Sequence, residues 1–226
     1  LRMSRRCSRI SDDAARWHDG ALGTILVDLN ANRRSGTDNR TNLEFYRTEV
    51  ERRCGICLSD PLIYEAFTYY DREVLPHKND DVINAHAMSG AHAALQAVQD
   101  AGLRCALFTN PSFPQGAIEC RMGWGDLADA PFELVTHMGN ATRCKPDATY
   151  YLEQLQMMGL EPHEVLMVGN DPKRDFPSPA CGIQTAYVGQ GKPGRATWHG
   201  TMEDFARNFN AVVEAFYEHQ VANELS

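Results

Sequence analysis

The sequence lacks an apolar run long enough to cross a membrane, which argues against an integral membrane protein. It also lacks an excess of basic residues, because 22 Lys and Arg stand against 30 Asp and Glu and give a formal charge of -8. Proteins that bind nucleic acids usually present a basic surface, so this balance argues against a nucleic-acid partner. No internal repeat or low-complexity tract is present. The remaining composition, 43% apolar and 23% charged, is typical of a globular protein.

A disulfide framework is not indicated either. The 226-residue chain contains seven cysteines, an odd number spread along its length, which favours reduced thiols and a cytoplasmic location. Cys54 and Cys57 have the spacing of half a zinc site or a redox pair, but no second pair of Cys or His with ligand spacing accompanies them. Residues 1–20 have no apolar segment of the kind found in secretory signals, and we expect them to form a polar tail.

The most informative stretch is a short apolar run that is followed by two carboxylates. Residues 165–168 are apolar and predict a buried strand, which ends at Gly169. Asp171 and Asp175 follow four residues apart, where the carboxyl end of a parallel strand would place them in a ligand-binding crevice. Such carboxylates are suitable ligands for Mg²⁺. The same residues also fit the start of a helix, with Asp171 as its N-cap.

A second apolar run, residues 23–30, also contains an acid near its end. Because the run is continuously apolar, it predicts a central parallel strand whose two faces are both covered, with Asp28 close to its carboxyl end. The polar residues 31–42 predict a loop. An acid at the end of a buried strand needs a partner, which makes Asp28 a candidate site residue.

The following block is helical and contains no convincing strand. Asp60 and Pro61 have the pattern of an N-cap and first helical position, and the block extends to about residue 76. We therefore predict a small helical cap, residues 35–84, inserted into an α/β core of residues 21–34 and 85–226.

Strands and helices alternate after this insertion. The pattern predicts helices at 89–101, 115–124, about 147–158 and 176–181, strands at 103–111, 132–137, 165–168 and 184–188, and a final helix from Thr201. This alternation predicts an α/β fold: a doubly wound parallel (Rossmann-like) sheet with a small helical cap insertion.

Right-handed connections would bring the polar ends of these strands to one edge of the sheet. The candidates there are Asp28, Thr109, Lys145 and the pair Asp171 and Asp175. Taken singly, Thr109 is also compatible with capping a turn before Pro111, and Lys145 with an exposed position beside a helix start.

Together these residues resemble the signatures of the haloacid dehalogenase-like (HAD) hydrolase superfamily. The matching segments, in chain order, are Ile25–Asn30, Leu107–Asn110, Lys145–Pro146 and Val168–Asp175. The first match is partial and the other three are close. Many members of the superfamily carry a helical cap just after the first signature, where the predicted insertion falls.

The resemblance implies a role for each residue. Asp28 would be the nucleophile that forms an aspartyl-phosphate. Thr109 and Asn110 would bind the substrate, and Lys145 would bind the transferring group and offset its charge.

The resemblance also implies a bound Mg²⁺ as cofactor. Its ligands would be the carboxylates of Asp28 and Asp171 and the main-chain carbonyl of Asn30. Asp175 would complete or support this site.

The first signature departs from the pattern of active phosphatases. Those enzymes usually have a second Asp two positions after the nucleophile, where this chain has Asn30. An amide cannot donate or accept the catalytic proton, and loss of this assistance typically lowers the rate by roughly 10²–10⁴.

Three functions therefore remain open from the sequence. The first is a slow Mg²⁺-dependent phosphatase that acts on a small phosphate ester. The second is a catalytically impaired binding or regulatory protein on the same fold. The third is a dehalogenase-type hydrolase, although such enzymes do not need the metal-binding acids. The sequence indicates neither the ester nor the oligomeric state.

Overall fold

The computed structural model describes residues 21–224 of the chain, so the predicted polar tail lies outside the described residues. The first part of this range is helical, and helices and short strands alternate from residue 91 onward. The α-helices are α2 (Ala21–Asn30), α3 (Asn42–Cys54), α4 (Pro61–Tyr69), α5 (Ala91–Asp100), α6 (Gln115–Trp124), α7 (Ala148–Met158), α8 (Met202–Arg207) and α9 (Phe209–Glu224). The π-helical turns are η1 (Tyr70–Val74) and η2 (Asn79–Ile83), and the 3₁₀ turns are η3 (Pro162–Glu164) and η4 (Pro179–Cys181).

All strands of the described residues pair in parallel, which confirms the predicted α/β class. Strands β1 (Ala106–Leu107) and β2 (Leu134–Val135) form one small sheet. Strands β3 (Leu166–Gly169), β4 (Gln184–Val188) and β5 (Trp198–Gly200) form a second sheet in that order. Strands β1 and β2 are much shorter than the strands predicted at 103–111 and 132–137. Strand β5 was not predicted from the sequence.

The strand predicted at residues 23–30 is wrong, because these residues form helix α2. Ile25 and Leu29 are 0% and 2% exposed and pack against α3, whereas Val27 between them is 55% exposed. This one-sided burial has the period of a helix rather than that of a strand covered on both faces. A short, continuously apolar run is compatible with either structure, and here packing against α3 decides for the helix.

Several helix starts follow the predicted capping chemistry. The side chain of Asp60 accepts a hydrogen bond from the main-chain nitrogen of Leu62, at the start of α4. Thr201 and Asp204 form a reciprocal capping box at the start of α8. The helix predicted at 176–181 is wrong, since only the 3₁₀ turn η4 forms there. Prolines at positions 177 and 179 remove main-chain donors that a longer helix would need.

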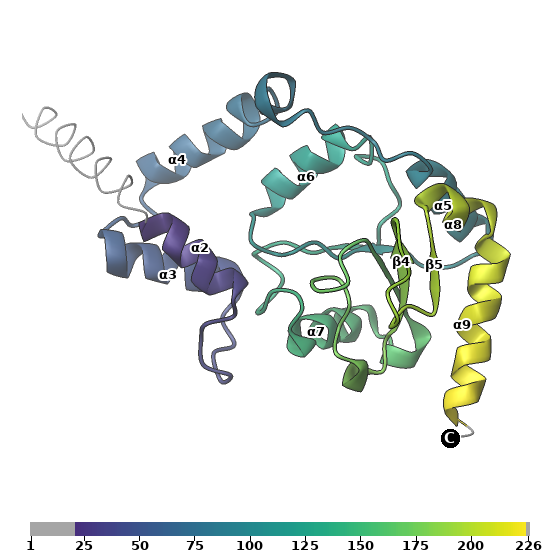
Figure 1. Ribbon diagram of the computed structural model, residues 1–226. Coiled ribbons are helices and arrows are strands. Elements are labelled where there is room, and N and C mark those ends of the chain that lie inside the picture. The colour runs from purple at the N-terminus through teal and green to yellow at the C-terminus, as the bar shows by residue number, and fades with distance from the viewer. Residues whose placement is uncertain (1–20, 225–226) are drawn as a thin grey trace, which may run out of the picture.

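The three-stranded sheet is covered by α5, α8 and α9 (Figure 1). The core of this layer contains Ala186 and Val188 from β4, Phe205 from α8 and Val212 from α9. A second apolar cluster lies under α7, where Tyr150, Tyr151 and Leu155 pack on the side of β3 and β1.

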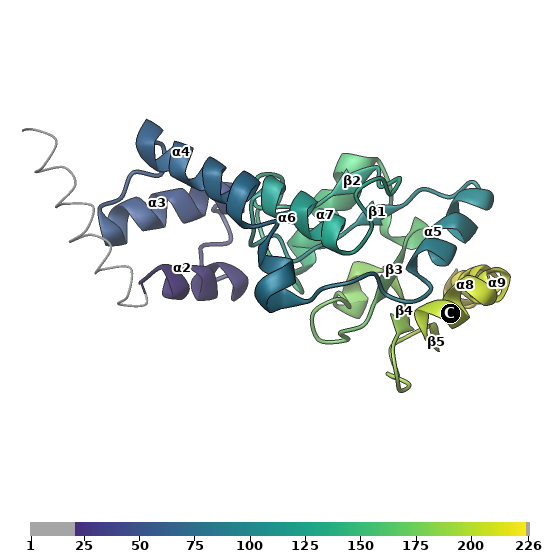
Figure 2. The ribbon, with the colours of Figure 1, turned by 90° about the horizontal axis from the view of Figure 1, so that it is seen from above.

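Helices α2, α3 and α4 lie together at one side of the molecule, and the strands lie at the other (Figures 1 and 2). The predicted boundaries of core and cap stay a prediction. However, α2, which falls in the predicted core, packs on α3, which falls in the predicted cap. No described helix combines the length and apolarity that a membrane crossing requires.

Gly90 fixes the approach of α5 to α8, and an Ala at this position should be destabilising. Its φ angle is +84°, and an added Cβ would lie 2.6 Å from the main-chain nitrogen of Glu203. We expect Gly90→Ala to lower the free energy of unfolding by roughly 2–3 kcal/mol, from the left-handed backbone and the clash together. Gly102→Ala is the control, because φ is +68° there and no atom lies within 4 Å. That variant should lose only about 1 kcal/mol in urea unfolding, and equal losses would contradict the role of the contact with Glu203.

Candidate functional site

A cavity of about 870 Å³ lies between α2, the carboxyl end of β1, and α6. It contains several of the residues that the sequence singles out. Its lining comprises Leu26, Val27, Asn30, Ala31, Leu107, Thr109, Asn110, Ser112, Phe113, Ile118, Arg121, Met122, Leu127, Lys145, Arg174 and Asp175. The structure therefore brings Asn30, Thr109, Asn110, Lys145 and Asp175 to one place.

Lys145 and Asp175 form the polar centre of this cavity. The Nζ atom of Lys145 donates a hydrogen bond of 2.9 Å to Oδ1 of Asp175, and the two side chains are 6% and 17% exposed. Burial lowers the pKa of Lys145, and the Asp175 carboxylate opposes this shift. The hydroxyl of Tyr151 donates to the main-chain carbonyls of Arg174 and Asp175, at 2.8 and 2.9 Å, which fixes the backbone that carries the acid.

The turn after β3 uses both carboxylates for its own hydrogen bonds. Oδ2 of Asp175 accepts from the main-chain nitrogens of Asn170 and Asp171, at 3.1 and 3.0 Å. Oδ1 of Asp171 accepts from the nitrogens of Lys173 and Arg174, at 3.0 and 3.3 Å. Asp171 thus caps a turn, in agreement with the alternative interpretation of this stretch, although the turn does not continue as an α-helix.

Thr109 and Asn110 follow β1, as the sequence predicts, and their polar atoms are largely engaged. The hydroxyl of Thr109 donates to the carbonyl of Thr136 at 2.7 Å. The carbonyl of Thr109 accepts a hydrogen bond from the Tyr150 hydroxyl, also at 2.7 Å. Nδ2 of Asn110 donates to Oδ1 of Asn30, while Oδ1 of Asn110 is buried and has no hydrogen-bond partner among the described residues.

Asp28 does not line the cavity. Its carboxylate lies 2.9 Å from the guanidinium of Arg53 on α3 and 3.4 Å from that of Arg33. This position follows from the helical conformation of residues 21–30, in which Asp28 and Asn30 point in different directions. The predicted gathering of Asp28 with Asp171 and Asp175 around one point is therefore not seen.

A family model for haloacid dehalogenase-like hydrolases matches residues 25–181. The chain belongs to this hydrolase family. The match includes all four segments that carry the resemblance in the sequence, from Ile25 to Asp175. No curated protein matches the chain.

Solved structures of other HAD-like hydrolases share the fold. A β-phosphoglucomutase from Clostridium difficile is 15% identical, with a TM-score of 0.52 over 80% of this chain and 79% of that chain. An L-2-haloacid dehalogenase from Xanthobacter autotrophicus is 13% identical, with a TM-score of 0.50 over 86% and 84%. At these identities the likeness concerns the fold alone.

The arrangement of acids in this HAD-like chain does not fit a Mg²⁺ ion. Among residues 21–224, no three His, Cys, Asp or Glu side chains lie close enough together to hold a metal. Asp28 is paired with arginines, and both oxygen atoms of Asp175 already accept hydrogen bonds. A divalent ion needs several free oxygen ligands, and in this conformation two of the carboxylates expected to bind it, Asp28 and Asp175, are engaged in other contacts.

One contact that the sequence reasoning missed holds Lys145 in place from the loop after α2. Nδ2 of Asn32 donates to the carbonyl of Cys144 at 3.0 Å, and Oδ1 of Asn32 accepts from the nitrogen of Cys144 at 2.8 Å. Asn32 thus pairs with the residue before Lys145 as a neighbouring strand would. The only signal in the sequence is an Asn in a loop, a residue that often replaces main-chain hydrogen bonds.

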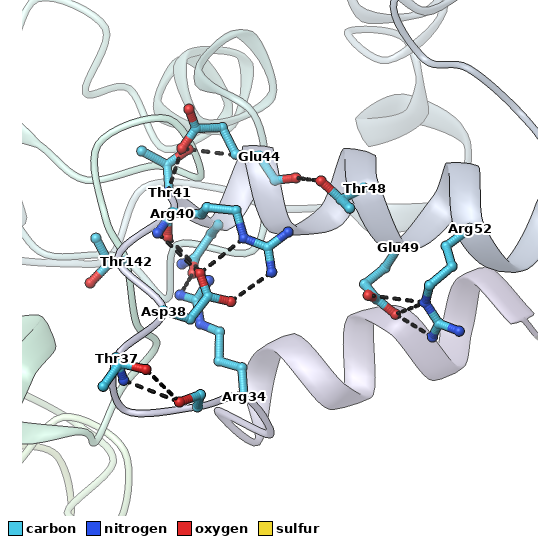
Figure 3. A network of polar contacts seen from close by, with 12 residues as sticks. Arg34, Thr37, Asp38, Arg40, Thr41, Glu44, Thr48, Glu49, Arg52 and Thr142 are labelled. Atoms are coloured by element: carbon cyan, nitrogen blue, oxygen red, sulfur yellow. Dashed lines mark hydrogen bonds and ion pairs between the residues drawn. The ribbon is translucent and has the colours of Figure 1, made fainter.

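Arg143 strengthens the same connection. It is 5% exposed and donates hydrogen bonds to the main-chain carbonyls of Ser35, Gly36 and Asp38. Asp38 itself is held by a two-pronged contact with Arg40, at 2.9 and 2.7 Å, which lowers the pKa of Asp38 to about 2 (Figure 3). The loop is therefore an ordered support of the cavity and not merely a connection between layers.

Proposed function

We propose that this HAD-like protein binds a small phosphate ester in the cavity and that it is a binding module rather than an efficient phosphatase. The observation that carries this proposal is the separation of Asp28 from the cavity that contains Lys145. The groups that attract an anion are present in the cavity, whereas the carboxylate that would attack phosphorus is bound to Arg53.

The charge of the cavity supports anion binding. Its lining includes the cations Arg121, Lys145 and Arg174, against the single acid Asp175. Lys145 is desolvated, so its ammonium interacts with a bound phosphate more strongly than an exposed lysine would. Arg174 is 73% exposed and can move toward a ligand at the cavity mouth.

The amide at the position of the expected general acid supports the second half of the proposal. The residue two positions after Asp28 is Asn30, whose amide bonds to Asn110 and to the carbonyl of Leu26. Neither bond supplies an acid or a base. With Asp28 outside the cavity and an amide at position 30, the cavity has neither the expected nucleophile nor the expected general acid, and bound ester would be retained instead of cleaved.

Membership of the hydrolase family favours a second candidate, the slow Mg²⁺-dependent phosphatase expected from the sequence. It requires Asp28 to exchange its contact with Arg53 for a position beside Asp171. The dehalogenase-type hydrolase is the third candidate and would release halide from small halo-acids without a metal.

Calorimetric titration and a turnover assay on the same protein separate these candidates. We expect inorganic phosphate and small phosphate esters to bind with or without Mg²⁺, and to be released uncleaved. Brisk Mg²⁺-dependent release of phosphate that disappears in Asp28→Asn would overturn the proposal in favour of the phosphatase. Metal-independent release of halide would favour the dehalogenase.

Asp28→Asn provides a prediction that does not depend on which ester is bound. Because Asp28 lies outside the cavity, the dissociation constant for inorganic phosphate should change by less than about twofold. Loss of the contact with Arg53 should lower the free energy of unfolding by roughly 0.2–1 kcal/mol, the usual range for a pair near the surface. Asp129→Asn, an exposed change of the same chemistry, is the control. A tenfold change in phosphate affinity in Asp28→Asn alone would place this carboxylate in the site.

A further inference from the structure

The cavity is larger and more apolar than a phosphate group requires. Its volume of about 870 Å³ lies in the upper part of the range for sites that bind drug-sized ligands. Much of the lining is made of apolar side chains from α2, β1, the segment after β1, α6 and the residues that follow α6. These are Leu26, Val27, Leu107, Phe113, Ile118, Met122 and Leu127. The ester bound there is therefore expected to carry an apolar body.

Phe113 and Arg121 give the apolar lining a specific geometry. The Cζ atom of Arg121 lies 5.2 Å from the centre of the Phe113 ring, over its face. The carbonyl of Phe113 accepts a hydrogen bond of 2.9 Å from the nitrogen of Met138, which fixes the backbone of this residue. Phe113 remains 42% exposed although the guanidinium covers one face of its ring. A large apolar side chain that is held in place and still accessible inside a cavity has surface available for a ligand.

Arg121 is also available electrostatically. It forms no salt bridge with any residue in the described range 21–224, whereas the other arginine of the cavity, Arg174, lies 3.8 Å from Asp171. A guanidinium is planar and weakly hydrated, so it stacks on aromatic rings through both of its faces. Arg121 is exposed, so the part of its guanidinium that does not face Phe113 is open to a second ring.

We propose that the ester is an aryl phosphate, whose ring stacks against the Phe113–Arg121 pair while its phosphate lies near Lys145. This inference rests on the proposed function, because it assigns the organic group of the ester that the cavity binds. It distinguishes planar aromatic groups from saturated groups of the same size, which the apolar wall alone would not reject.

Phenyl phosphate and cyclohexyl phosphate test this distinction, since they have the same charge and nearly the same size. In calorimetric titrations, the wild-type protein should bind phenyl phosphate roughly threefold to tenfold more tightly than cyclohexyl phosphate. The saturated ring is the more hydrophobic of the two, so apolar burial alone predicts the opposite order. Inorganic phosphate is titrated in parallel to report on the anion-binding part of the cavity.

Three variants complete the experiment. Arg121→Gln and Phe113→Leu should lower the ratio of the phenyl to the cyclohexyl ester affinity to one or below. Arg174→Gln removes a positive charge from the same cavity without touching Phe113, and it should weaken both esters together and preserve the ratio. A wild-type ratio of one or less, or a ratio that Arg121→Gln leaves unchanged, would overturn the aryl assignment. Failure of inorganic phosphate and both esters to bind would instead overturn the proposed function itself.

Discussion

Lys145→Met is expected to weaken binding of inorganic phosphate by at least roughly 100-fold and to lower the free energy of unfolding by roughly 2–4 kcal/mol. The first effect arises because the ammonium is the desolvated cation at the centre of the cavity. The second arises because Asp175, which is 17% exposed, would keep its charge without its partner. The main-chain nitrogens of Asn170 and Asp171 still donate to Oδ2 of Asp175 in this variant. The loss of unfolding free energy should therefore stay below the largest values found for broken buried ion pairs.

Calorimetric titration with phosphate and urea unfolding measure the two effects separately. Lys192→Met, the same change at an exposed position of the loop after β4, is the control and should alter neither quantity. The double variant Lys145→Met with Asp175→Asn removes the unpaired charge as well. It should recover part of the stability and none of the affinity, which separates loss of binding from loss of folding. Phosphate affinity that survives in this folded double variant would contradict the assignment of Lys145.

The sequence was most informative where local chemistry decides the structure. The acid or hydroxyl residues that precede α4 and α8 act as N-caps, as predicted, because a side-chain oxygen satisfies main-chain donors within two or three residues. The meeting of Lys145 with Asp175, which are 30 residues apart, was also predictable. Both residues come after strands in the chain, and a parallel α/β arrangement brings the carboxyl ends of its strands to one edge of the sheet.

The position of Asp28 was not predictable in the same way. A run of ten residues that is mostly apolar can be buried as a strand or as a helix, and its identity depends on what it packs against. The packing of Ile25 on Val50 and Cys54 of α3 is a tertiary contact with no local signature. The contact between Phe113 and Arg121 was missed because it also depends on tertiary structure. Phe113 precedes α6, and Arg121 lies on the face of α6 that meets the cavity.

Gly169→Ala is expected to lower the free energy of unfolding by about 3 kcal/mol and to weaken phosphate binding at least roughly tenfold. Gly169 is the last residue of β3, and an added Cβ would lie 2.6 Å from Oδ2 and 2.7 Å from Cγ of Asp175. The carboxylate cannot retreat easily, since it is held by Lys145 and by the nitrogens of Asn170 and Asp171. The methyl group must therefore displace the acid, and the ammonium bonded to it moves as well.

The same measurements on Gly123→Ala provide the control for this last variant. Gly123 lies within α6, where no atom is within 4 Å of an added Cβ, so Ala should stabilise the helix by roughly 0.5–1 kcal/mol. If Asp175 and Lys145 act as one unit, Gly169→Ala loses stability and affinity together, and Gly123→Ala loses neither. A Gly169→Ala protein that is destabilised but binds phosphate with wild-type affinity would show that the position of Asp175 does not govern the anion site. We thus expect that the lack of a side chain at Gly169 lets Asp175 lie close to the end of β3, where Asp175 holds the ammonium of Lys145 in position for the anion.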